Sequence, residues 1–148
     1  MRFVVQRVTH ASCKVDGQIT GQIEKGFLIF VGIADSDTEE IADKMVKKAM
    51  GLRIFDDEND KINLSLADVG GGVLLISQFT LYANCKKGYR PSFTEAGKPD
   101  MAEALYEYII KKAGEYCPIV RKGIFGADMK IELLNDGPFT ILLDSDNL

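Results

Sequence analysis

The sequence predicts an α/β protein in which mixed β-sheets form a barrel-like core under two main covering helices. Three observations lead to this prediction. Short apolar and β-branched runs dominate the start and the end of the chain, two segments carry apolar residues at helical spacing, and 148 residues make one ordinary domain. We therefore expect a single domain over residues 1–148.

The first third of the chain is typical of strands. Residues 3–8 open a strand whose alternating pattern continues to Asp16-Gly17, a favoured hairpin turn, and residues 19–23 return. Residues 27–33 (FLIFVGI) are apolar throughout. Such a run indicates a central strand that is covered on both faces.

Two helices follow from periodicity and from capping residues. Asp37 is the expected cap of the first helix, with Glu40 three positions later as in a capping box, and Gly51 ends it. The second helix is expected to begin near Pro99. Its predicted inward stripe consists of Met101, Ala102, Leu105, Tyr108 and Ile109.

Further strands are predicted at residues 52–55, 73–82, 119–125, 129–134 and 139–143. Residues 56–61 are expected to form an acidic, solvated turn, and residues 135–138 a turn between the last two strands. Residues 83–99 are rich in Gly, Pro and basic side chains, so we expect a long loop, which in a small domain is often functional.

Composition limits the class of protein. A net charge of -4 argues against a general nucleic-acid-coating protein. Cys13, Cys85 and Cys117 are an odd number without a CxxC pair, which favours reduced thiols over disulfides or zinc. Because the chain shows neither a signal-peptide core nor a membrane-spanning run, we expect a cytoplasmic protein.

Few side chains are suited to acid–base or nucleophilic catalysis. His10 is the only histidine, and a surface role for it is favoured over a catalytic one. No GxGxxG, P-loop or HExxH motif is present, and no residue cluster requires a metal or another cofactor. In the segment Ser77-Gln78-Phe79-Thr80 an apolar strand turns polar, which by composition alone favours an ordinary strand end.

Two more segments allow a functional and a plain interpretation. Gly137-Pro138 fits a hairpin turn, but a cis bond there would aim two carbonyls the same way, as a receptor for an ammonium group. The basic residues Lys86, Lys87 and Arg90, with Tyr89 between them, fit a solvated loop or a contact with nucleic-acid phosphates. Arg121 and Lys122 would extend that patch.

Six segments in order resemble one family. They are VVQRV, LRIFDDE, SQFTLYA, KKGYRPSF, GIFGADM and NDGPFTILLDS, and they span the chain. Together they resemble the D-aminoacyl-tRNA deacylases of the bacterial and eukaryotic type. Phe139 departs from the smaller aliphatic residue that is frequent at its position, which puts the local packing in question.

The resemblance implies a mixed α/β fold and a homodimer with an active site at each side of the interface. It implies hydrolysis of the ester in D-aminoacyl-tRNA and in glycyl-tRNA, with neither DNA nor a membrane as partner. Gly137-Pro138 would be a cis turn that reaches into the partner's site, supported by Arg7. The pocket would be lined by Ser77, Gln78, Phe79 and Thr80, with Phe125 and Met129 at the terminal adenosine.

A mechanism can be argued for such a site. The carbonyls of Gly137 and Pro138 would capture the substrate's ammonium, and an N–H of Gln78 or Phe79 would hold the oxyanion. An L side chain would then clash with the turn. Without a base near Thr80, we favour attack by water assisted by the substrate's ribose hydroxyl, with Thr80 structural.

Three alternatives stay open at this point. The chain could be a non-catalytic binding module for aminoacyl-tRNA or another RNA. It could be a dimeric hydrolase or binding protein for an unrelated small molecule, or a purely structural β-rich dimer.

Overall fold

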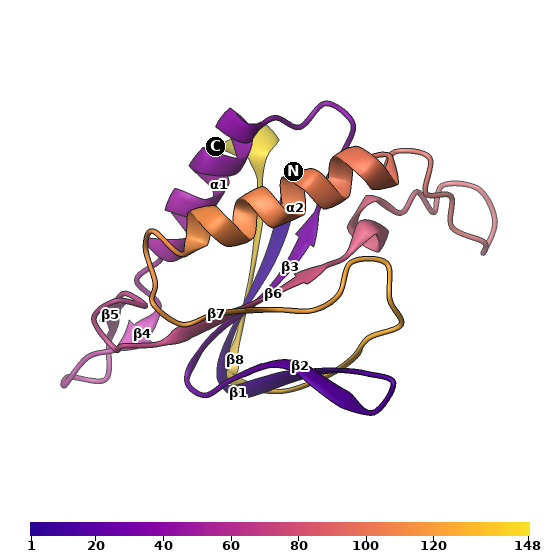
Figure 1. The fold of residues 1–148 in the computed structure, drawn as a ribbon. Coiled ribbons are helices and arrows are strands. Elements are labelled where there is room, and N and C mark those ends of the chain that lie inside the picture. Colours follow the sequence, from indigo (N-terminus) through magenta and orange to yellow (C-terminus); the bar gives the residue numbers. More distant parts are fainter.

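The computed structural model describes residues 1–148, and its sheet is organised by the long strand β1 (Arg2–Val15). One edge of β1 pairs antiparallel with β8 (Lys130–Asp144). The other edge pairs first with β3 (Gly26–Gly32) and then, further along, with β2 (Gln18–Ile23). The predicted hairpin between β1 and β2 is confirmed, and Figure 1 shows it at the bottom of the molecule.

The parallel part of the sheet positions the site. β3 pairs in parallel with β6 (Gly72–Ser77), which pairs in parallel with β7 (Val120–Lys122), so the order is β2-β1-β3-β6-β7. β2 approaches β7 closely, since a Cβ at Gly21 would lie 2.7 Å from the carbonyl oxygen of Lys122. This approach nearly closes the sheet into the predicted barrel-like core.

Two helices, α1 (Glu39–Met50) and α2 (Pro99–Ala113), lie side by side over one face of the sheet. Their apolar faces and the facing side of the sheet form the larger hydrophobic cluster, and a smaller cluster fills the inside of the barrel. The fully buried Tyr106 satisfies its hydroxyl by donating to the carbonyl of Leu75 at 2.7 Å. None of the helices combines the length and the apolar character needed to cross a bilayer.

The cap of α1 differs from the prediction. Thr38, not Asp37, accepts from the N–H of Ile41, three residues into the first turn. Asp37 was the wrong choice because its carboxylate is occupied elsewhere, by the Met1 ammonium and the N–H of Ala34. The predicted end of the helix at Gly51 is confirmed.

Three predicted strands are shorter than expected. The segment 52–55 contributes only to β4 (Phe55–Asp56), which forms a small hairpin with β5 (Ile62–Leu64) around the acidic turn. The strand predicted at 73–82 ends at Ser77, and a 3₁₀-helix, η1 (Phe79–Tyr82), follows. The predicted strand 119–125 is reduced to β7, because only three of its residues pair with β6.

The last two predicted strands are one continuous strand, β8, which ends before the short 3₁₀-helix η2 (Ser145–Asn147). Gln6 faces Thr140 and Val8 faces Asn135, so five steps along β8 match two along β1. The intervening residues around Gly137 form a bulge within the strand. The predicted turn at 135–138 was therefore wrong as a hairpin, because both flanking segments pair with the same partner strand.

Candidate active site

A pocket of about 800 Å³ opens at the carboxyl ends of β3 and β6. Its walls come from those strands, from the start of η1, from the loop before α2, from the first turn of α2 and from the segment 125–131. More than half of its lining residues are hydrophobic. Crevices at the carboxyl ends of parallel strands are the usual ligand sites of such sheets, and this volume suits one small organic ligand.

Three of the four residues of the SQFT segment line this pocket: Ser77, Gln78 and Phe79. The fourth, Thr80, is exposed and does not line it, and its hydroxyl accepts from Nε2 of Gln78 at 2.6 Å. Gln78 and Thr80 do not alternate with Ser77 and Phe79 as residues of one strand would, because β6 stops at Ser77 and Phe79 begins η1.

The main chain of this segment has one donor already in use. The N–H of Gln78 donates to the carbonyl of Val31 at 2.8 Å, where the backbone extends the pairing of β6 with β3. Phe79 is the first residue of η1, so its N–H has no acceptor within that helix. Of the two N–H groups considered as oxyanion donors, only that of Phe79 is left for a ligand.

The segment after β7 forms another wall. Phe125 and Met129 both line the pocket, each half-buried. Phe125 packs against Tyr106 of α2, with ring centroids 6.1 Å apart, and Met129 packs on the cluster inside the barrel. The two side chains therefore line the same cavity as Ser77, Gln78 and Phe79 and are held from behind by the core.

The end of η1 is tied to the beginning of β1. Arg2 donates from Nη1 to the carbonyl of Leu81 at 2.8 Å, and its guanidinium lies 4.5 Å from the ring centroid of Tyr82. Burial raises the pKa of Tyr82 to about 12, and the carboxylate of Asp37 adds to this effect. Tyr82 therefore stays neutral and serves as an anchor for the segment that carries Phe79.

The loop before α2 is anchored on the turn that follows β3. The N–H of Gly97 donates to the carbonyl of Ile33 at 2.8 Å, and the N–H of Lys98 donates to Oδ1 of Asp35, also at 2.8 Å. Asp35 and Lys98 both line the pocket. Neither was predicted, although two carboxylates directly after a buried strand, Asp35 and Asp37, were a signal that could have been used.

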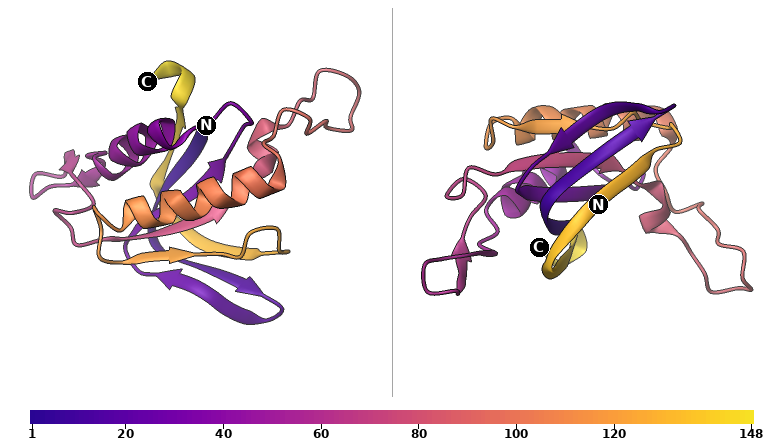
Figure 2. Two further views of the ribbon diagram at one scale, coloured as in Figure 1. Left: turned by 45° about the horizontal axis from the view of Figure 1, so that its top comes forward. Right: turned by 90° about the horizontal axis from the view of Figure 1, so that it is seen from below.

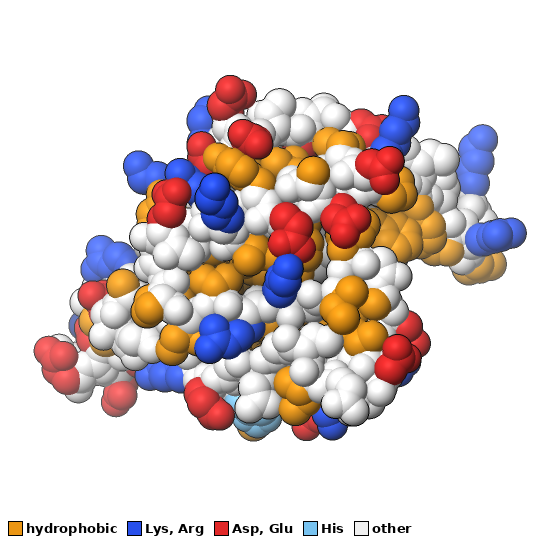
Figure 3. All heavy atoms as spheres, in the orientation of Figure 1, with side chains coloured by type: hydrophobic (Ala, Val, Ile, Leu, Met, Phe, Trp, Pro, Cys, Tyr) orange, Lys and Arg blue, Asp and Glu red, His pale blue; other side chains and the backbone are white.

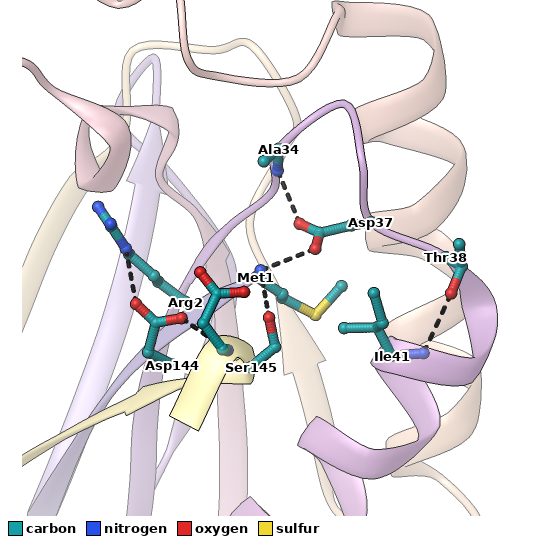
Figure 4. A network of polar contacts seen from close by, with 9 residues as sticks. Met1, Arg2, Ala34, Asp37, Thr38, Ile41, Asp144 and Ser145 are labelled. Carbon is teal, nitrogen blue, oxygen red and sulfur yellow. Dashed lines mark hydrogen bonds and ion pairs between the residues drawn. The ribbon is translucent and has the colours of Figure 1, made fainter. Parts of the chain in front are cut away.

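A polar network holds the same turn from behind (Figure 4). The Met1 ammonium donates to Oδ1 of Asp37 at 2.7 Å and to the hydroxyl of Ser145 at 2.8 Å. Oδ2 of Asp37 accepts from the N–H of Ala34 at 2.7 Å. Asp37 is buried, so these bonds fix the backbone beside the pocket rim.

Arg7 lies on β1 and is only 6% exposed. It donates from Nε to the carbonyl of Asp136 at 3.0 Å and from Nη1 to the carbonyl of Ile54 at 2.7 Å. The carboxylates of Asp56 and Asp136 each lie 3.6 Å from its guanidinium. A buried charge is stable only with such partners, and here they connect the β8 bulge to the β4 segment.

The bulge carries Gly137 and Pro138, and the peptide bond between them is cis, as the resemblance implies. Both residues are exposed and neither lines the pocket of its own chain. Gly137 has a φ of +131°, which side chains rarely adopt, and a Cβ there would lie 3.1 Å from Nη2 of Arg7. The backbone conformation at position 137 and the nearby Arg7 guanidinium therefore both favour glycine over a residue with a side chain.

Phe139, the departure from the family pattern, has a packing role. Its ring is half-buried against the larger core cluster, and the Arg7 guanidinium lies 4.9 Å from its centroid. The aromatic ring therefore adds a cation–π contact to Arg7 beside the bulge. The N–H of Phe139 donates to Oδ1 of Asn135 at 2.7 Å, which closes the bulge from its other side.

The loop between η1 and α2 extends from the body as an arm, residues 84–95, which both views in Figure 2 show clearly. Lys86, Lys87 and Arg90 are exposed on it, and Figure 3 shows basic side chains there, to the right of an apolar area. Lys122 does not extend this patch freely, since it pairs with Glu107 of α2 at 2.9 Å.

The remaining candidates lie apart from the pocket. His10 is exposed on β1, does not line the pocket and contacts the hydroxyl of its neighbour Thr9 at 3.3 Å. The three cysteines are free, with Cys13 and Cys117 buried and Cys85 exposed. No three or more His, Cys, Asp or Glu side chains converge in a geometry that could hold a metal ion.

Residues 4–144 match the family model of the D-Tyr-tRNA(Tyr) deacylases. The chain belongs to this family. It is 55% identical over 148 residues to the D-aminoacyl-tRNA deacylase of Sulfurihydrogenibium sp., with all of both chains covered. It is 52% identical over 145 residues to that of Clostridioides difficile, covering 98% of this chain and 97% of the relative.

Two solved structures share the fold of the chain. The chain is 38% identical to a c-Myc DNA Unwinding Element Binding Protein, with a TM-score of 0.92 over 97% of this chain and 98% of that one. A probable eukaryotic D-amino acid tRNA deacylase shares the fold at 17% identity, with a TM-score of 0.83 over 96% of this chain and 97% of that one.

Proposed function

We propose that this chain hydrolyses the ester bond between a D-amino acid, or glycine, and the terminal ribose of tRNA. One observation carries the proposal: in this chain of the deacylase family, the SQFT segment ends β6 at the main pocket, and the N–H of Phe79 has no acceptor within η1. The products are the free amino acid and tRNA.

The pocket has a division of roles that fits this substrate. Phe125 and Met129 offer an apolar wall for the terminal adenine. Ser77 at the end of β6 and Phe79 at the start of η1 line the same pocket and would lie next to the ester. The N–H of Phe79 then donates to the oxyanion, and one such donor is worth ~3 kcal/mol in the transition state.

The β8 bulge of a second copy of the chain binds the ammonium of the substrate. Gly137 and Pro138 are exposed and lie outside their own pocket, which suits action on another subunit. Leu134 and Leu142 on the same strand are 48% and 61% exposed, an apolar edge suited to burial in a homodimer. The carbonyls of Gly137 and Pro138 then face the ammonium, and Arg7 holds the bulge in place.

Chirality follows from this arrangement. With the ammonium, the ester carbon and the ribose all fixed, Cα has two remaining directions. One leads to open space and takes a hydrogen or a D side chain, whereas the other leads into the bulge, where an L side chain clashes. Glycine has no side chain to reject, so it is hydrolysed as well.

Water is activated without a protein base. His10 lies outside the pocket, Thr80 does not line it, and the two carboxylates that do, Asp35 and Asp128, already bind the N–H of Lys98 and the ammonium of Lys130. The role therefore falls to the substrate's own neighbouring ribose hydroxyl. Water adds to the ester carbon while that hydroxyl relays its proton, and a tetrahedral oxyanion forms. The oxyanion collapses and expels the ribose oxygen, which takes up the relayed proton to become the free hydroxyl of tRNA, and the amino acid leaves with its carboxylate. Thr80 supports the position of Gln78 through their hydrogen bond.

The basic arm compensates for the overall charge of -4. Lys86, Lys87 and Arg90 would contact phosphates of the acceptor end, giving a salt-sensitive affinity. Because aminoacyl-tRNA is used in translation, this substrate also fits a protein of the cytoplasm. The arm is the feature that favours a tRNA substrate over an unrelated small molecule.

The test compares matched substrates. D-Tyr-tRNA, L-Tyr-tRNA and Gly-tRNA are incubated with the purified protein, and release of the free amino acid is followed. Hydrolysis of the D and glycyl substrates with the L substrate left intact is the expected result. Binding of D-Tyr-tRNA without release of D-tyrosine would instead establish a non-catalytic binding module.

A further inference from the structure

Two phenylalanine side chains meet at the mouth of the pocket and are open to solvent. Phe79 is 55% exposed and Phe93 is 37% exposed, and both line the pocket. Their ring centroids lie 5.0 Å apart, with the ring planes at 72°. An edge-to-face pair leaves ring surface uncovered, so this is an apolar platform and not a closed core contact.

The position of Phe93 is fixed from both sides. Before it, Asn84 and Ser92 exchange two backbone hydrogen bonds, at 2.7 and 2.9 Å. After it, the N–H of Gly97 is held by the carbonyl of Ile33. The ring is therefore presented in one place although it belongs to a long loop, and a ligand need not order it on binding.

The platform lies where the substrate chain must leave. The pocket volume of about 800 Å³ suits one nucleoside with its amino acid. The preceding nucleotide then lies outside the mouth, on the side that Phe93 and the arm share. Lys86, Lys87 and Arg90 lie on the same arm, three to seven residues before Phe93 in the chain, so the arm carries positive charge together with one ring of the aromatic pair.

We propose that Phe79 and Phe93 form a stacking platform for the nucleobase that precedes the terminal nucleoside of a single-stranded RNA end. The proposal rests on the proposed function for the identity of the pocket's occupant. Bases stack on exposed aromatic rings with little regard to sequence, and basic side chains beside them follow the backbone. Phe93 is thus a specificity residue for polynucleotide over single-nucleoside substrates.

The test uses Phe93, because Phe79 also belongs to the reacting segment. Phe93→Leu keeps apolar volume and removes the ring face, whereas Phe93→Trp enlarges it. Tyr116→Leu is the matched control, since Tyr116 is an aromatic residue 41% exposed and outside the pocket. Each variant is assayed on D-Tyr-tRNA and on D-tyrosyl-adenosine, which lacks the preceding nucleotide.

Phe93→Leu should raise KM for D-Tyr-tRNA about tenfold, the effect of losing one stacked base, and leave KM for D-tyrosyl-adenosine unchanged. Tyr116→Leu should match the parent protein, and Phe93→Trp, which keeps a ring face, should retain the parent's preference for D-Tyr-tRNA over D-tyrosyl-adenosine. Equal losses on both substrates would show that Phe93 only shapes the pocket. A changed dimer dissociation constant would show that a second copy covers the ring, and either result overturns the proposal.

A binding measurement separates this inference from the proposed function. The chain has no tryptophan, so Phe93→Trp carries a single fluorescent reporter. Titration with the trinucleotide CCA should quench it saturably, and a trinucleotide with an abasic central position should bind about tenfold more weakly. Quenching without any hydrolysis of D-Tyr-tRNA would refute the enzyme but keep the platform. Identical curves for the two trinucleotides would refute the platform.

Discussion

Arg7 donates a hydrogen bond from its buried Nε to the backbone carbonyl of Asp136, 3.0 Å away, and so fixes the residue that precedes Gly137. Its Nη1 reaches Ile54 at the same time. A single guanidinium thus joins the β8 bulge to a segment more than eighty residues earlier in the chain. Any group bound by the bulge depends on this geometry.

Arg7→Lys should lower kcat/KM at least about tenfold, because an ammonium cannot span both carbonyls as the planar guanidinium does. Arg7→Ala should in addition destabilise the fold by about 2 kcal/mol, since it leaves two carbonyls without their donor. Urea unfolding and hydrolysis of D-Tyr-tRNA measure the two effects.

Arg53→Lys is the matched control, because Arg53 is exposed and its guanidinium hydrogen-bonds only to Asn63. This substitution should leave kcat/KM and the free energy of unfolding unchanged. A parental kcat/KM in Arg7→Lys would show that the bulge does not need this residue for catalysis.

Thr80→Val should retain kcat within about threefold, because the substitution keeps the branched shape and removes only a hydroxyl that lies outside the pocket. Losing the hydrogen bond from Gln78 should cost the fold about 1 kcal/mol. Single-turnover hydrolysis separates the chemical step from product release. Abolished turnover with intact substrate binding, restored in Thr80→Ser, would make Thr80 the nucleophile.

Much of the fold could be predicted because its signals are local. The β1–β2 hairpin, the apolar strand β3 and the end of α1 at Gly51 follow from turn residues and periodicity. Thr38 replaced Asp37 as the cap because a contact distant in sequence, with Met1, took the carboxylate. Local patterns cannot report such competition.

The same limit applied to the site. The segment SQFT was found, but not its break after Ser77, since strand and 3₁₀-helix share the same residue types here. The continuity of β8 depends on β1, more than one hundred residues away, which holds both halves of it. Asp35 and Phe93 were missed because their roles arise only when the loop before α2 folds against β3 and η1.

Asp144→Asn should destabilise the protein at neutral pH, and the difference should disappear in acid. The N–H of Asp146 and, less strongly, the guanidinium of Arg2 hold the pKa of Asp144 below 3.8, although burial opposes them (Figure 4). A folded-state pKa that is lower than the unfolded one stabilises above the unfolded value, and this stability is lost as the pH falls through the folded value.

Unfolding free energies of both proteins at pH 7 and at several pH values falling well below 3.8 measure this effect, because the loss is complete only under the lowered pKa of Asp144. Asp16→Asn is the comparison, because Asp16 is an exposed turn residue whose own carboxylate has no bonding partner. Its free energy of unfolding should equal that of the parent at every pH. A difference for Asp144→Asn that is the same at every pH would show that packing, and not charge, accounts for it.

Asp35→Ala should raise KM for D-Tyr-tRNA, because the N–H of Lys98 loses its acceptor and the pocket wall before α2 loosens. The expected stability loss is about 1 kcal/mol, as for a lost helix cap. Asp35→Asn keeps an oxygen acceptor and should stay close to the parent. Steady-state kinetics with thermal unfolding measure both effects.

Asp68→Ala is the control for that change. Asp68 accepts from the N–H of Ser65 at 2.9 Å, a similar contact far from the pocket. It should lower stability to a similar degree and leave KM unchanged. If Asp35→Ala behaved like Asp68→Ala in both respects, Asp35 would be a structural cap without influence on the pocket.

Reversing the charge of both Lys86 and Lys87 to Glu should weaken binding of D-Tyr-tRNA, because these exposed side chains on the arm would meet phosphates with the wrong sign. KM should rise at least about tenfold at low salt and converge on the parental value as salt screens the contacts. The matched control changes Lys44 and Lys48 to Glu, which gives the same net charge. Both lysines are exposed on α1 and absent from the pocket lining. An unchanged KM at low salt for the arm variant, or an equal rise for the α1 variant, would remove the arm from tRNA recognition.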